Sequence, residues 1–418
     1  MVRAAALPPT VCTMHPLKDE TMAKATPEIG QLQPLNAGFL IITALLAVVL
    51  GAWHLITQPQ VIAPFIGCLV LYLMCGLSIT AGYHRLFSHR TYKASNLAKF
   101  ILAVVGSANW QNSIIEWASD HRRHHRFVDT DNDPYDARRG FWWSHMGWIM
   151  FRSRFHDDLS NVKDLIKDPI CAWQHKYYWP ISIAFNVGVT VGLGILTDNI
   201  LGMVIWAGLV RVVIVHHTTF FINSWAHMFG AQPYSDQNTA KDSTLLAFFT
   251  HGEGYHNYHH AFETDYRNGR MWYHYDPGKW LIALMSYTGM AWDLRRIPDD
   301  MVLRRRFEER RSHLWLQLKD WGEVWETWKE DMAGVAMETQ DALKNHLVTA
   351  EAAIDEALSE LRTTRSAWQK AQRNRLPKAE IRSLNRTMRT AQHTLREALN
   401  EWERMIDEYT LTMAAAHA

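Results

Sequence analysis

The chain has 418 residues, and its 43 Lys and Arg nearly balance its 42 Asp and Glu, so the formal net charge is +1. This balance creates no basic field and gives no indication of a nucleic-acid partner. The four cysteines are scattered without a CxxC pair, which argues against a disulfide framework and a cysteine metal site. The 19 tryptophans are many for this length, and Trp gathers at membrane interfaces.

Residues 1–35 lack the continuous apolar core of a signal peptide, so we predict a flexible cytosolic arm. Four apolar runs follow, each almost free of formal charge and long enough to cross a bilayer. These predicted transmembrane helices cover residues 36–57, 61–81, 178–197 and 200–221. The loops within the two pairs are very short and carry no Lys or Arg.

The segment 97–118 is apolar but is interrupted by Lys99, Gln111, Asn112 and Glu116. We predict a re-entrant or interfacial segment here, because polar groups at membrane depth normally line a cavity. Residues 281–292 are apolar but too short to span. Four crossings leave both termini on one side, and the Lys and Arg concentrated there predict that this side is cytosolic.

Three histidine clusters lie on that same side of the predicted membrane. They follow the patterns HxxxxH, HxxHH and HxxHH and contain His84, His89, His121, His124, His125, His256, His259 and His260. Eight histidines are too many for one zinc ion. An imidazole-rich set of this size suits a pair of redox metals, with iron as the expected metal for oxygen chemistry. His227 is a candidate ninth ligand, and Asn223 lies four residues before it, on the same face if helical.

Metal-bound imidazoles are neutral, and a hydrogen-bond acceptor normally orients each ring. The candidates for this role are Glu116, Asp120, Asp133, Glu253 and Asp265. The histidines outside the patterns are predicted to be structural: His145, His156, His175, His216, His217, His251 and His274.

From about residue 301 the sequence becomes charged and favours helix. Two series of apolar residues step by three and four, as in a heptad seam: Leu347, Ala350, Ile354, Ala357 and Leu361, and then Ile381, Leu384, Met388, Ala391, Leu395, Ala398, Trp402, Met405 and Tyr409. Asn374-Arg375-Leu376-Pro377 interrupts the two helices. We predict a cytosolic helical hairpin over residues 301–418 that packs on itself, with oligomerisation or partner docking as the alternative.

The histidine boxes and their flanks resemble the membrane fatty-acid desaturases of the acyl-CoA Δ9 (stearoyl-CoA) type. The flanks are Gly82-Tyr83, Glu116-Trp117, the Asn223-x-x-x-His227 pair and Gly252-Glu253-Gly254-Tyr255. The resemblance covers about residues 36–295 and predicts a membrane desaturase domain over 36–300. It implies an all-α integral membrane protein with four transmembrane helices and a cytosolic diiron domain, to which this chain adds the C-terminal hairpin.

The resemblance also implies roles for individual residues. The eight box histidines and His227 would bind two iron ions, with Asn223 completing the set through a water. Gln111, Trp117 and Thr219 match positions at the bend of a substrate tunnel, while Asn112 and Asp120 match positions that hold a CoA head group. O2 would be the co-substrate of a fatty acyl thioester. Because the chain has no flavin, nicotinamide or haem motif, a ferredoxin-, rubredoxin- or cytochrome b5-like donor with its reductase would supply the electrons.

Two alternatives share parts of this pattern. A membrane diiron hydroxylase of fatty acids or alkanes uses similar ligands, but four residues separate His84 from His89, where many hydroxylases have three. A non-enzymatic metal-binding or transport protein predicts charged or histidine residues lining several spans. The predicted spans contain only His54, Arg211 and the pair His216-His217.

Overall fold

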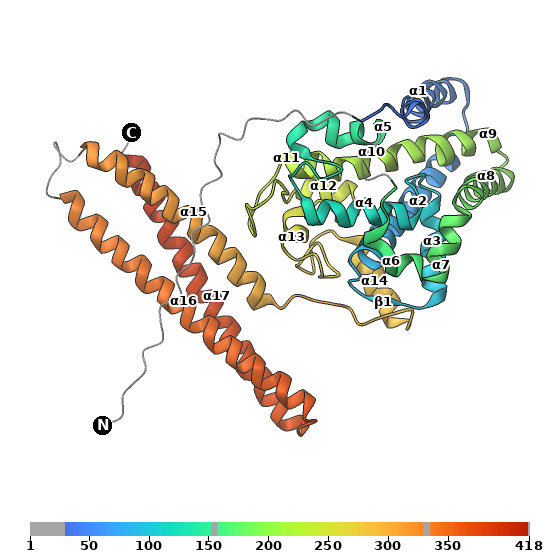
Figure 1. Cartoon of the computed structure of the whole chain (residues 1–418). Helices are drawn as coiled ribbons and strands as arrows, with labels where there is room; N and C mark the ends of the chain where they lie inside the picture. The colour runs from blue at the N-terminus through green and yellow to red at the C-terminus, as the bar shows by residue number, and fades with distance from the viewer. Residues whose placement is uncertain (1–29, 152–156, 329–334, 417–418) are drawn as a thin grey trace.

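The computed structural model describes residues 30–151, 157–328 and 335–416, and the side chains of residues 314–344 and 408–416 are not described. The predicted arm up to residue 29, and His156, lie outside the described residues. A body of packed helices holds the predicted membrane and histidine-rich parts of the chain (Figure 1). Long C-terminal helices extend away from this body.

Within the described residues, four helical segments are long and apolar enough to cross a membrane. They cover Pro34–Thr57, Ile62–Ser88, Tyr178–Leu196 and Ile200–Met228. Their outward side chains are apolar and exposed, as with Val48 at 71% and Leu196 at 81%. This exposure suits a surface covered by lipid, so the prediction of an all-α membrane protein with four crossings is confirmed.

The second and fourth crossings are not uniform α-helices. The second joins α2 (Ile62–Leu77) to a π-helical stretch, Ser78–Ser88. The fourth contains α9 (Ile200–Met203), a π-helical stretch (Val204–Val210), α10 (Arg211–Asn223) and α11 (Trp225–Met228). The first and third are α1 (Pro34–Thr57) and α8 (Tyr178–Leu196). π-helical turns are rare and occur frequently at functional sites.

The segment predicted to be re-entrant or interfacial forms α3 (Asn96–Ser107), which is too short to span, followed by α4 (Ile114–Phe127). Both pack on the π-helical stretch in one core with the buried side chains of Tyr83, Leu102 and Ile282. The other helices are α5 (Trp148–Met150), α6 (Lys163–Ile166), α7 (Pro169–Lys176), α12 (Thr244–Phe249), α13 (His256–Ala261) and α14 (Pro277–Tyr287). Strands β1 (Lys93–Ala94) and β2 (Ala291–Trp292) pair antiparallel, with Lys93 opposite Trp292.

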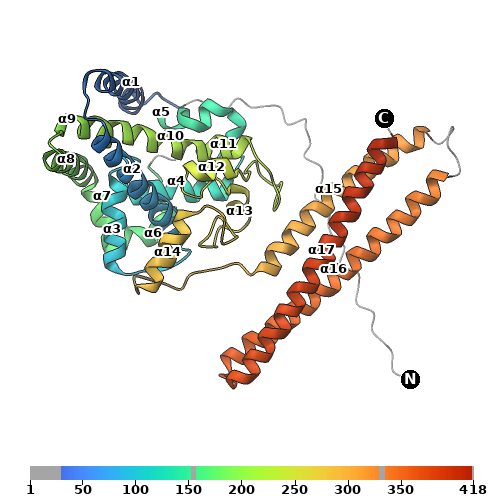
Figure 2. The ribbon, with the colours of Figure 1, turned by 180° about the vertical axis from the view of Figure 1, so that it is seen from behind.

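The C-terminal region consists of α15 (Asp299–Trp328), α16 (Val335–Arg373) and α17 (Lys378–Ala416). Helices α16 and α17 run antiparallel, as predicted, and are joined at the break before Lys378 (Figure 2). The predicted seam is buried, with Leu361 and Leu395 fully covered. Helix α15 adds Phe307 to this core, against the ring of Trp402 at 4.9 Å.

Candidate metal centre

The first histidine box depends on the π-helical turn. In an α-helix, residues five apart point about 140° away from each other. Here the backbone N–H of His89 donates to the carbonyl of His84 at 3.0 Å, which is the i to i+5 bond of a π-helix. The wider turn brings both rings to one side, and their centroids lie 4.8 Å apart.

The second and third boxes lie on short helices with defined starts. Helix α4 begins with a capping box, in which Ser113 and Glu116 bond each other's backbone N–H groups. His121, His124 and His125 follow within the same helix, where spacings of three and four share a face. Helix α13 carries the third box, and α11 carries His227.

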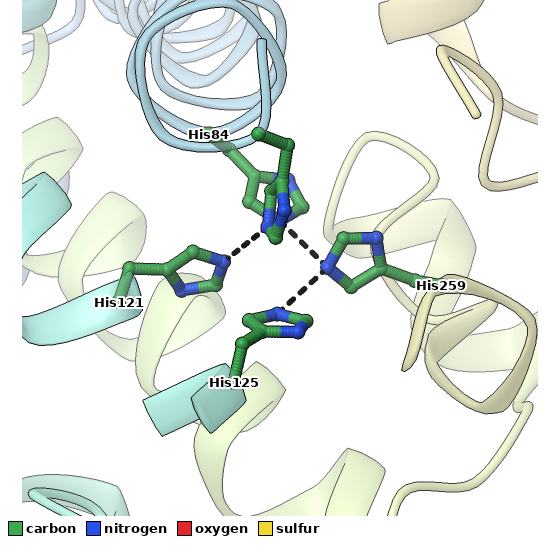
Figure 3. A group of neighbouring side chains, drawn as sticks. His84, His121, His125 and His259 are labelled. Atoms are coloured by element: carbon green, nitrogen blue, oxygen red, sulfur yellow. Dashed lines mark hydrogen bonds between the residues drawn. The ribbon is translucent and has the colours of Figure 1, made fainter. Parts of the chain in front are cut away.

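The nine histidines form two groups. His84, His89, His121, His125 and His259 form the first group, and His124, His227, His256 and His260 form the second. Within each group, every residue offers one ligand atom within 4.8 Å of the others. In the first group, Nε2 of His84 lies 3.0 Å from Nε2 of His259, and Nε2 of His89 lies 2.8 Å from Nε2 of His121. Figure 3 shows the rings of four members of this group, His84, His121, His125 and His259, pointing toward one another.

The second group is built in the same way. Nε2 of His227 and Nε2 of His260 lie 3.0 Å and 3.1 Å from Nε2 of His256. His124 and His260 are 3.3 Å apart through the same atoms. All four rings are buried or nearly so, which places the second group in the interior beside the first.

In several of these rings, Nδ1 contacts a carboxylate or hydroxyl oxygen outside the group. Glu253 lies 2.8 Å from Nδ1 of His84, and Asp133 lies 2.9 Å from Nδ1 of His124. Glu263 lies 3.4 Å from Nδ1 of His125. His227 Nδ1 is 2.8 Å from the hydroxyl of Thr239, which in turn donates to Asp129. These acceptors fix the tautomer that leaves the Nε2 lone pair facing the centre.

The geometry fits a metal. In each pair one ring, His84 or His227, has its Nδ1 on an outward acceptor, so its Nε2 lone pair faces Nε2 of the partner ring at 3.0 Å. Nitrogens that converge in this way offer their lone pairs to a cation between them. Burial, followed by the neighbouring rings, lowers the pKa of His121, His256, His259 and His260 well below the usual value. Burial likewise lowers the pKa of His125 to about 4. The rings are therefore neutral, which is the form that binds metals.

Glu253 is the centre of a buried charged network. Burial alone would raise its pKa, but His84 and Arg85 lower the pKa of Glu253 to about 2. The guanidinium of Arg85 is 3.0 Å from Glu253 and 2.9 Å from Asp276. The residue before Glu253 is Gly252, whose φ of +101° lies in the region that favours glycine. A Cβ atom at this position would lie 2.6 Å from Asp276 Oδ1, so there is no room for a side chain.

A cavity of about 390 Å³ reaches this centre, with His84, His121 and Glu253 in its wall. All five predicted substrate residues line it: Gln111, Asn112, Trp117, Asp120 and Thr219. The amide of Gln111 donates to the hydroxyl of Thr219 at 3.0 Å, and the ring of Trp117 stacks on His121 at 4.8 Å. Asn223 also lines this cavity.

The predicted orienting carboxylates divide into two kinds. Asp133 and Glu253 reach ligand rings, whereas Glu116 caps α4 and Asp265 pairs with Arg267. Asp120 lines the cavity. Sequence reasoning missed Glu263 and Thr239. Glu263 follows the third box by three residues and could have been proposed from that spacing, but Thr239 has no local signal.

Among the residues that the structure describes, the histidines predicted to be structural lie outside both groups. His145 is bonded to Ser224 at 2.9 Å and to His217 at 3.0 Å. His216 is bonded to the carbonyl of Asn109 at 2.6 Å. His251 is buried against the ring of Tyr72, with centroids 4.9 Å apart.

The fold and the site define a class: a helical integral membrane protein whose two histidine groups fit a metal site at the wall of a cavity. The profile of the family described as "Fatty acid desaturase" matches residues 60–295. The chain belongs to this family.

Three relatives are similar to parts of this chain. A probable acyl-CoA desaturase of Schizosaccharomyces pombe is 41% identical over 278 residues, 65% of this chain and 58% of the relative. Acyl-CoA desaturase 1 of Saccharomyces cerevisiae is 41% identical over 241 residues, 57% of this chain and 47% of the relative. A Δ9-fatty-acid desaturase of Caenorhabditis elegans is 35% identical over 249 residues, 56% of this chain and 71% of the relative.

The chain thus spans about half the length of the two yeast relatives. The predicted resemblance to acyl-CoA desaturases is confirmed by these matches.

Proposed function

We propose that this protein is a fatty acyl desaturase that converts a saturated acyl-CoA to a cis-monounsaturated product at the Δ9 position, in the biosynthesis of unsaturated fatty acids. One observation carries the proposal: nine imidazoles converge in two groups beside a cavity lined by His84 and His121. The names of the relatives support acyl-CoA as the substrate class and Δ9 as the position.

The nine histidines are the proposed ligands of two iron ions, and Asn223 is proposed to contribute through a water. Imidazole ligands suit iron, and the family membership supports oxygen chemistry. The bound iron pair would provide the redox chemistry that reduces O2 to two waters. This reduction would consume two electrons and two protons from outside and two hydrogen atoms from the acyl chain. Glu253 and Asp133 are not proposed as ligands, because each already contacts Nδ1 of a ligand ring.

The cavity walls are proposed to select the reacting carbons. An acyl chain has no polar group near its middle, so shape must fix its position and orientation. Gln111 and Thr219 hold one part of the wall together through their hydrogen bond, and Trp117 covers His121 from the substrate side. Asn112 and Asp120 are the proposed contacts of the polar head group. The apolar wall would also exclude water from the reacting carbons.

We place the active site and both termini in the cytosol, since Lys and Arg are concentrated on that side of the four crossings. The chain's proposed division is an arm (1–35), a desaturase domain (36–300) and a helical extension (301–418). An external donor, such as a ferredoxin, a rubredoxin or a cytochrome b5-like protein with its reductase, would supply the electrons. The C-terminal helices are a possible surface for oligomerisation.

The test is fatty-acid profiling after expression in a host that lacks its own desaturase, with a suitable electron donor. The wild-type chain should produce a new cis monoene. His121→Ala and His260→Ala, one from each group, should abolish it, because each removes a proposed ligand. His393→Ala changes an exposed histidine on α17 and should leave the product unchanged.

Two results would overturn the proposal. Hydroxylated chains in place of alkenes would assign the site to a membrane hydroxylase. Protein present in the membrane with its iron bound, but without any new fatty acid, would show that the substrate is not an acyl chain.

A further inference from the structure

A second cluster of metal-ligating side chains lies where the desaturase domain meets α15. The loop over residues 231–242 is closed by a bridge between Ala231 and Asp242. Arg305 of α15 bonds this loop, donating to the carbonyl of Tyr234 at 2.9 Å and to the hydroxyl of Ser235 at 3.1 Å. The next residue of the loop, Asp236, faces two further side chains of α15.

These side chains are Glu309 and His313, one helical turn apart on the same face of α15. Nε2 of His313 lies 3.6 Å from Asp236 Oδ2 and 3.5 Å from Glu309 Oε1. Two donors bound about 2.0–2.1 Å from a tetrahedral zinc ion are about 3.4 Å apart, so the spacing matches a shared ion. Histidine nitrogens and Asp or Glu oxygens are both among the donors that zinc uses.

Glu309 provides an independent observation. Its side chain is only 7% exposed, and its Oε1 atom, which faces His313, accepts no hydrogen bond within the described residues. Burial and the nearby charge of Asp236 raise the pKa of Glu309. A buried carboxylate oxygen without a donor is costly unless a cation or a proton satisfies it. A side-chain hydrogen bond with Asp236 also raises this pKa, while the guanidinium of Arg305 and the backbone N–H of Asp236 lower it.

We propose that Asp236, Glu309 and His313 bind one divalent transition-metal ion of the zinc type, separate from the nine-histidine centre. Asp236 and His313 are about half exposed, so water has access to complete the coordination. The ion joins the loop of the desaturase domain to the C-terminal extension. It has a structural role at this junction.

The junction is also connected to the third histidine box. Asn257, between His256 and Tyr258, accepts from the backbone N–H of Tyr234 at 2.9 Å. Its amide donates to the carbonyls of Ser235 and Ala240 at 2.6 Å and 2.9 Å. The proposed ion therefore fixes a loop that is hydrogen-bonded to α13 through Asn257.

The experiment uses the full-length, iron-loaded protein in detergent, titrated with Zn²⁺ while iron content is followed by elemental analysis. The wild type should bind one zinc without losing iron. Asp236→Asn, Glu309→Gln and His313→Ala should each weaken zinc binding by more than about 100-fold. This exceeds the loss expected when a residue only hydrogen-bonds to a ligand. His393→Ala is the matched control, since it removes an exposed histidine paired with Glu397 one turn away, and should bind zinc as the wild type does.

A gain-of-signal variant keeps the test decisive if a substitution harms folding. His313→Cys loaded with Co²⁺ should gain a thiolate-to-cobalt charge-transfer band, and His393→Cys should not. Wild-type protein that binds no zinc beyond its iron would overturn the proposal and assign the pair Asp236 and Glu309 to a shared proton. Equal zinc binding by the wild type and His313→Ala would overturn it as well.

Discussion

The desaturase domain and the α16–α17 hairpin are stabilised in different ways. The interior of the domain contains charged side chains, with Arg85 at 1%, Glu253 at 4% and Asp276 at 0% exposed. The interior of the hairpin is an apolar seam in which Ile354 and Leu361 are fully buried. The charged pair of Arg306 with Glu403 on the C-terminal helices is partly exposed.

The difference follows from what each region has to hold. A metal centre needs neutral rings at fixed orientations, and only buried acceptors with their own partners can fix them. The hairpin only has to bury its apolar seam, so a seam residue can be replaced by another apolar residue of similar size with little loss of stability. A substitution should therefore alter metal binding in the first region and only local stability in the second.

The largest effect is expected for Glu253→Gln. The amide can no longer accept as an anion from His84, and Arg85 loses one of its two carboxylates. Iron affinity should fall about 10–100-fold. Glu263→Gln is the matched control, because its carboxylate is 53% exposed and 3.4 Å from His125, and it should change affinity only about twofold. Titration of both variants with Fe²⁺ measures the difference, and equal losses would contradict the distinction between buried and exposed acceptors.

An intermediate effect is expected for Leu361→Ala in the seam. Removing a fully buried leucine should lower the local free energy of unfolding of the hairpin by about 2–5 kcal/mol. Hydrogen exchange of α16 and α17 measures this directly. Val348→Ala, at a position 51% exposed on the same helix, should change exchange far less. Desaturase activity should persist in both, and its loss with Leu361→Ala would show that the hairpin supports the site.

The smallest effect is expected for Arg304→Ala on α15. Its ion pair with Glu308 spans one turn at 2.6 Å, and both side chains are substantially exposed. Such pairs contribute about 0.3–0.5 kcal/mol. Hydrogen exchange of α15 should be nearly unchanged. A shift above about 1 kcal/mol would mean that this surface pair is part of the docking of α15 on the domain.

Much of this architecture could be predicted from local sequence. Uncharged runs of bilayer length predict the crossings, and the repeat through Leu347, Ile354 and Leu361 predicts the hairpin. The histidine boxes could be grouped into one site because their patterns are similar and the predicted crossings put all three on one side.

The remaining features depend on contacts that no local pattern encodes. The π-helical turn that aligns His84 with His89 arises where Ser78–Ser88 packs against α3 and α4, so helical periodicity alone could not predict it. Thr239 reaches His227 from a separate loop twelve residues later. Asp236 meets Glu309 across more than seventy residues, and that proximity depends on how α15 docks.

The most direct test of the central claim is the iron stoichiometry of the purified full-length protein, measured together with its Mössbauer spectrum. If the nine histidines form one centre with two groups, the wild type should contain two iron ions per chain in a magnetically coupled pair. His89→Ala in the first group and His227→Ala in the second should each reduce this below two. A wild-type protein that binds at most one iron per chain, with its histidines intact, would contradict the account.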